Sequence, residues 1–93
     1  MAYEEGLNRF RQFAAVQDEA RAVFLQKNAD YGDAFSKHGP IGVLIRMGDK
    51  LQRLTHISRT EIALVDDETL RDTAMDLHNY SAMLVMLLDE NDE

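Results

Sequence analysis

Acidic side chains recur along residues 67–80 at spacings that a helix would place on one face. Asp72 and Asp76 are four residues apart, and Glu68 precedes Asp72 by another four. Because a helix advances about 100° per residue, these carboxylates share one arc, with Asn79 beside them. Neighbouring carboxylates repel each other and stay charged only beside a cation. The spacing therefore predicts either basic partners or a hard cation such as Mg²⁺ at this arc.

The stretch 41–59 offers both kinds of partner. Arg46, Asp49, Lys50 and Arg53 fall within an arc of about 100° on a helix. Asp49 would bring a carboxylate from a neighbouring helix to the pair formed by Asp72 and Asp76, and the basic residues would meet carboxylates or phosphates. The plain alternative is a solvated face, which is what most charged helix faces are.

One observation favours more than a solvated face. The acidic arc of residues 67–80 runs on into Met83 and Met86, which suggests a second packing surface, against another subunit or a ligand.

The segment Lys27–Gly32 carries a lysine, an acid, an aromatic residue and a glycine. Gly32 fits a left-handed helix C-cap, while Lys27 and Tyr31 could instead contact a phosphate and a base.

These residues need helices to position them. Gly32, Gly39, Pro40 and Gly42 predict one loop, and a less clearly marked break is expected at 62–67. We therefore expect helices over 3–28, 41–59 and 67–89. Asp66 or Asp67 is the expected N-cap of the third helix. Apolar stripes at spacings of three and four are expected to be buried: Phe10, Phe13, Gln17, Ala20 and Phe24; Leu44, Met47, Leu51 and Leu54; Leu70, Ala74, Leu77, Ser81, Leu84 and Leu88. The predicted fold class is all-α, an antiparallel array of three main helices.

Composition limits the remaining possibilities. Ninety-three residues predict one domain, 1–93, with a frayed acidic tail at 89–93. A net charge of −7 argues against direct polynucleotide binding, and the three histidines lack zinc-ligand spacing. The absence of cysteine, of a leader and of a long apolar run predicts a cytoplasmic protein that does not bind membranes.

Three blocks together resemble the nucleotide-modification-associated domain 1 family of bacteria and phages. They are Lys27-x-x-Asp30-Tyr31-Gly32, Ile45-Arg46-Met47-Gly48-Asp49-Lys50-Leu51-x-Arg53-Leu54 and Glu68-x-x-x-Asp72-x-x-x-Asp76-Leu77-x-Asn79-Tyr80. The likeness covers about residues 24–88. That family is similar in turn to the all-α nucleoside triphosphate pyrophosphatases, the MazG-like and dimeric dUTPase group.

The resemblance implies a homodimer or homotetramer with a four-helix-bundle-type core. It implies Mg²⁺-dependent hydrolysis, with Mn²⁺ as the alternative ion, of a natural or modified nucleoside triphosphate to the monophosphate and pyrophosphate. Asp49, Asp72 and Asp76 would bind the metal, and Glu68 and Asp76 would be catalytic. The residues expected to bind the substrate are Lys27, Asp30, Tyr31, Arg46, Lys50, Arg53, Asn79 and Tyr80.

The sequence also departs from the pyrophosphatase pattern. Arg46 and Arg53 flank Asp49 where glutamates are usual, and Asp72-x-x-x-Asp76 replaces an ExxD pair. Two other functions therefore stay open. One is a nucleotide-binding domain without catalysis. The other is a helical assembly module whose arginines pair with aspartates of another subunit.

Overall fold

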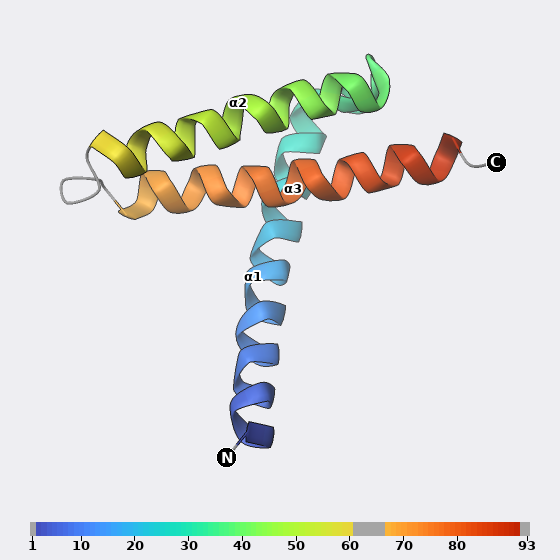
Figure 1. Cartoon of the computed structure of the whole chain (residues 1–93). Helices are drawn as coiled ribbons and strands as arrows, with labels where there is room; N and C mark the ends of the chain where they lie inside the picture. The colour runs from blue at the N-terminus through green and yellow to red at the C-terminus, as the bar shows by residue number, and fades with distance from the viewer. Residues whose placement is uncertain (1, 61–66, 92–93) are drawn as a thin grey trace. The chain divides into compact units, whose positions relative to one another are not determined.

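A computed structural model describes residues 2–60 and 67–91, and every regular element in these ranges is helical (Figure 1). Helix α1 spans Ala2–Tyr31, α2 spans Gly39–Thr60 and α3 spans Asp67–Asn91, with a short 3-10 turn, η1, at Ala34–Ser36. The three predicted helices are confirmed to within a few residues. Helix α3 begins at Asp67, and Asp66 lies outside the described residues.

The chain divides into two compact units, Met1–Gly32 and Asp33–Glu93. The first unit is α1, and the second holds η1, α2 and α3. Helices α2 and α3 pack side by side and run in opposite directions, so the second unit is a helical hairpin (Figure 1). None of the described helices is long and apolar enough to cross a membrane.

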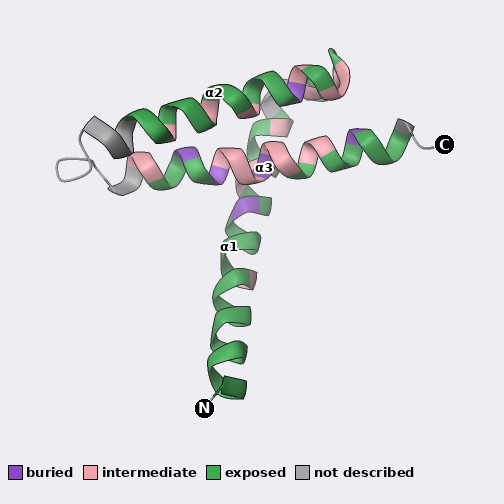
Figure 2. Cartoon of the chain, viewed as in Figure 1, coloured by how far each residue is buried: buried purple, intermediate pink, exposed green. Residues whose placement is uncertain are grey.

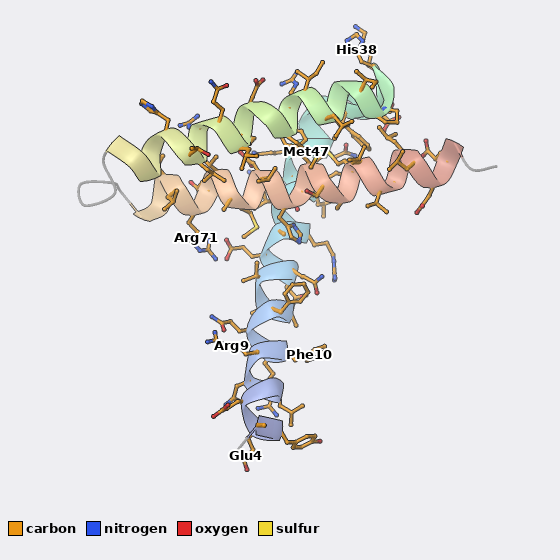
Figure 3. All side chains as sticks on the ribbon, viewed as in Figure 1. Glu4, Arg9, Phe10, His38, Met47 and Arg71 are labelled. Carbon is orange, nitrogen blue, oxygen red and sulfur yellow. The ribbon has the colours of Figure 1, made fainter. Side chains whose placement is uncertain are left out.

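The inner face of α2 is set by a repeat of four, three and four residues. It comprises Val43, Met47, Lys50 and Leu54, all buried or half-buried. Val43 is only 2% exposed, and Met47 lies on the side of α2 that faces α3 (Figure 3). The matching row of α3 comprises Thr69, Thr73, Asp76, Tyr80, Met83 and Leu87. Each hairpin helix therefore places one charged residue in the middle of its packing face.

The predicted stripe of α2 is wrong at Leu44 and Leu51, which are exposed, Leu51 by 56%. The reason is that α2 is apolar on two sides, and a periodic pattern does not say which side packs on α3. On α3, Ala74 and Leu88 are likewise exposed, while the remaining predicted positions, Leu70, Leu77, Ser81 and Leu84, are half-buried.

The predicted stripe of α1 is also exposed over much of its length. Phe10 and Phe13 are exposed, while Ala20 is buried and Phe24 half-buried. Figure 2 shows the same trend, with exposed residues dominating the N-terminal turns of α1. The aromatic half of this stripe thus has no covering layer within its own described unit.

The predicted C-cap at Gly32 is confirmed. Its φ is +62°, and its N–H donates to the Asn28 carbonyl oxygen at 2.7 Å. The loop is shorter than predicted, because Pro40 lies in the first turn of α2, where its missing N–H leaves no bond unmade. Within the connection, the Ser36 hydroxyl donates to the Asp33 carboxylate at 2.7 Å.

Replacing Gly32 by alanine is expected to lower the free energy of unfolding by about 1–2 kcal/mol, because a Cβ is strained at positive φ. Thermal or urea unfolding measures the change. Gly6→Ala is the matched control, since Gly6 lies within α1 and a Cβ added there would meet open space. That control should be neutral or stabilising, and equal destabilisation by both changes would contradict the assignment of Gly32 as the cap.

Candidate functional site

The centre of the candidate site is an ion pair between the two hairpin helices. Lys50 Nζ of α2 lies 3.2 Å from Asp76 Oδ2 of α3. The pair is half-buried, with the two side chains 27% and 21% exposed. Both residues were predicted from the sequence to belong to the site, and the structure brings them together.

Stability alone does not account for such a pair. Exposed ion pairs contribute about 0–1 kcal/mol, and partly buried ones lose much of their attraction to desolvation. Replacing a buried ion pair by well-packed apolar residues is often neutral or stabilising. A charged pair inside a packing face is therefore a functional-site candidate.

Charged and amide side chains continue the pair along one flank of the hairpin. On α2, Arg46 and Arg53 lie four residues before and three after Lys50. On α3, Asp72 and Asn79 stand in the same relation to Asp76. Helical periodicity and the antiparallel arrangement put both rows on the same side. We call the six residues Arg46, Lys50, Arg53, Asp72, Asp76 and Asn79 the polar flank.

Exposure differs along the polar flank. Arg46, Arg53 and Asp72 are exposed, so their charges are available to a ligand in solvent. Asn79 is buried, at 7% exposure, and its side-chain oxygen lies 2.9 Å from His78 Nδ1. Tyr80, half-buried on the inner face, is the neighbouring aromatic residue.

Asp49 does not join the polar flank. It is exposed and lies about 130° around α2 from the inner face. Among the described residues, no three acidic, histidine or cysteine side chains are gathered closely enough to hold a metal ion. One chain thus offers Asp72 and Asp76 as neighbouring carboxylates, without Asp49 beside them.

The other predicted residues belong to the first unit or have side chains outside the described part of the structure. Lys27 is exposed in the last part of α1 and is part of the first unit. The side chains of Asp30, Tyr31 and Glu68 lie outside the described residues. Their roles stay predictions.

The inner-face row of α3 was not predicted as a buried face, and Thr73 and Tyr80 are two examples. Thr73 is buried near Asp76 on the same row, and its hydroxyl donates to the Thr69 carbonyl oxygen at 3.0 Å. Tyr80 was predicted only as a pocket residue, yet it lies on the packing row. The signal that could have found this row is the four-three repeat at 69, 73, 76, 80, 83 and 87, which polar residues interrupt.

Residues 27–88 match the family described as nucleotide modification associated domain 1. The chain belongs to the nucleotide modification associated domain 1 family. The matched part of this family member includes all of α2, most of α3 and every residue of the polar flank, whereas residues 2–26 of α1 lie outside it. No curated protein and no solved structure gave a significant match.

Proposed function

We propose that the polar flank binds a nucleoside triphosphate and hydrolyses it to the monophosphate and pyrophosphate. The observation that carries the proposal is the half-buried pair of Lys50 and Asp76, 3.2 Å apart, at the centre of the family-matched region. The family name supports a nucleotide as ligand. The likeness of the three sequence blocks to the MazG-like pyrophosphatases supports the reaction.

The donor set fits Mg²⁺ in part. Magnesium uses one or two carboxylates and takes its other ligands from water and substrate phosphates. Asp72 and Asp76 would supply the two carboxylates. Asp49 could add a third carboxylate only in another conformation of the chain or from a second copy of it. When bound there, the ion would neutralise phosphate charge and lower the pKa of a bound water.

The chain's own residues have separate roles in this proposal. Lys50 pairs with the Asp76 carboxylate and turns to the phosphates when they arrive. Arg46 and Arg53, exposed on either side, bind the outer phosphates. The resemblance assigns Asn79 and Tyr80 to the nucleoside pocket, although Asn79 is buried in one chain. Glu68 would orient the attacking water. The remaining three residues keep the substrate-binding roles that the resemblance implies: Lys27, Asp30 and Tyr31.

Nucleotide binding is tested by thermal shift with and without Mg²⁺. A ligand at a hundredfold excess over its Kd stabilises a folded protein by about 2.7 kcal/mol. We expect such a shift from a triphosphate with Mg²⁺ and a smaller one from the nucleoside alone. No shift with any of the common nucleoside triphosphates would contradict the proposal.

Arg53→Gln is expected to weaken triphosphate binding by about tenfold, because one charge-assisted hydrogen bond to phosphate is lost. Calorimetric titration measures the Kd. Arg71→Gln is the matched control, since Arg71 extends from α3 on the side away from α2 (Figure 3). Equal effects from both arginines would mean that only net charge matters and that the polar flank is not the site.

A second candidate function is helical assembly, and one specific surface favours it. The outer face of α2 carries Ile41, Leu44, Ile45 and Leu51, all exposed, with Gly48 among them. A Cβ added at Gly48 would meet nothing within 4 Å in one chain. A mid-helix glycine costs about 1 kcal/mol relative to alanine, and close packing of a neighbouring helix would account for it. This surface would form the proposed homodimer or homotetramer with a four-helix-bundle-type core.

The variant Gly48→Ala tests whether the outer face of α2 packs against a second copy of the chain or is exposed to solvent. In an isolated chain the change should stabilise α2 by about 0.5–1 kcal/mol. If a second copy packs closely at Gly48, the added methyl group should instead weaken self-association. Sedimentation equilibrium and thermal unfolding of the same samples distinguish the two results.

A further inference from the structure

The N-terminal half of α1 carries an exposed aromatic stripe that neither the polar flank nor the family match explains. Tyr3 is 79% exposed and Phe10 68% exposed, and Leu7 and Phe13 are also exposed. Phe10 projects outward from the helix in Figure 3. All four residues precede residue 27, where the family match begins.

The stripe has the spacing of a helix-pairing face. Tyr3, Leu7 and Phe10 of the stripe, with half-buried Ala14, follow one another at four, three and four residues, which keeps them on one side of α1 with Phe13 beside them. A single helix in water gains little stability by itself and depends on packing of its apolar side. The first unit consists of α1 alone, so this packing must come from outside that unit.

We infer that residues 3–14 of α1 pair antiparallel with the same residues of a second copy of the chain. In the register that joins apolar residues only, Phe10 meets Leu7 of the second copy and Ala14 meets its Tyr3. The twofold symmetry of a homodimer repeats both contacts. Four apolar layers result, which we call the α1 seam.

Charges beside the stripe support this register. Glu4 and Arg11 both directly follow core positions, Tyr3 and Phe10, so they flank the same edge of the seam. In the antiparallel register above, Glu4 of each copy lies next to Arg11 of the other. If one copy slid by seven residues along the other, Arg11 would lie next to Arg11 of the second copy and Glu4 next to its Asp18. Both pairs would then carry like charges. The sequence is therefore self-complementary in one arrangement and repulsive in the next.

The α1 seam does not depend on the proposed function. No polar-flank residue lies within residues 3–14, and hydrolysis could fail while pairing holds. The outer face of α2 is likewise a different surface of the chain. A test of the seam must therefore change charges within it and leave both other surfaces untouched.

Charge exchange in the full-length chain provides this test. Sedimentation equilibrium is measured for Glu4→Arg, for Arg11→Glu and for the double variant. Each single change should raise the dissociation constant by about tenfold, because two attractive pairs become repulsive in the symmetric dimer. The double variant should return to within about twofold of the original value. An equimolar mixture of the two single variants should also associate more tightly than either alone.

Asn8→Asp is the control, because Asn8 lies on the opposite side of α1 from Phe10 and should leave the dissociation constant unchanged. Phe10→Asp should remove the association step that depends on α1 and leave any assembly through the outer face of α2 in place. The inference is overturned if the double variant associates no better than the singles. It is also overturned if Phe10→Asp lowers the melting temperature without changing the mass, which would show that the stripe packs within one chain.

Discussion

Asp76→Asn is expected to abolish nucleotide hydrolysis, with a loss of at least about a hundredfold in kcat/KM. The asparagine side chain has almost the same shape, so Lys50 keeps a hydrogen-bond acceptor 3.2 Å away while the negative charge is lost. Because the pair is half-buried, we expect a loss of about 1 kcal/mol or less in unfolding free energy. Turnover measured alongside helical content and melting temperature separates loss of chemistry from loss of fold.

Asp89→Asn is the matched control for that change. Asp89 is exposed near the end of the same helix, and its substitution removes one negative charge without touching the hairpin's inner face. We expect its activity to equal that of the unaltered chain. Hydrolysis that survives intact in Asp76→Asn would take this residue out of the mechanism.

Val43→Asp is expected to have the largest effect on stability. Val43 is 2% exposed on the inner face of α2, where a carboxylate would be removed from water. The expected cost exceeds about 3 kcal/mol, a large share of the roughly 5–15 kcal/mol that typically holds a domain together. Urea unfolding followed by circular dichroism measures the loss.

Val85→Asp controls for the nature of the substitution. Val85 lies on α3 and is 56% exposed, so the same change there should alter the unfolding free energy by less than about 0.5 kcal/mol. A similar cost at both positions would mean that the hairpin does not pack through Val43.

The helices could be predicted from the sequence because their signals are local. Gly32 ends α1 with a positive φ, and Pro40 stands in the first turn of α2. Each signal acts through backbone geometry within one turn, so no knowledge of the packing partner is needed. The family was also predicted correctly, on residues of which the greater part lies in α2 and α3.

The inner faces could not be predicted in the same way, because they depend on contacts between helices. Leu44 and Leu51 made the more hydrophobic stripe of α2, yet the structure turns Val43 and Lys50 toward α3. A packing face with lysine or aspartate at its centre does not form a continuous apolar stripe in the sequence. The pairing of Lys50 with Asp76 required both registers at once.

The candidate site could be predicted only in part, because helical spacing shows which residues share an arc but not which edge of that arc faces the neighbouring helix. Spacing placed Asp72 and Asp76 on one arc, and it placed Arg46 and Arg53 beside Lys50. It also grouped Asp49 with them, since the four residues 46, 49, 50 and 53 share one arc of α2. The inner face runs along one edge of that arc, and Asp49 lies on the opposite edge.

We propose hydrolysis of a nucleoside triphosphate to the monophosphate and pyrophosphate at the polar flank. The most direct measurement incubates the full chain with Mg²⁺ and a panel of natural and base-modified nucleoside triphosphates, and then separates pyrophosphate from orthophosphate. We predict pyrophosphate release from at least one member of the panel, lost in Asp76→Asn and kept in Asp89→Asn. Stable binding with neither product formed, or orthophosphate release that Asp76→Asn leaves unchanged, would contradict the claim.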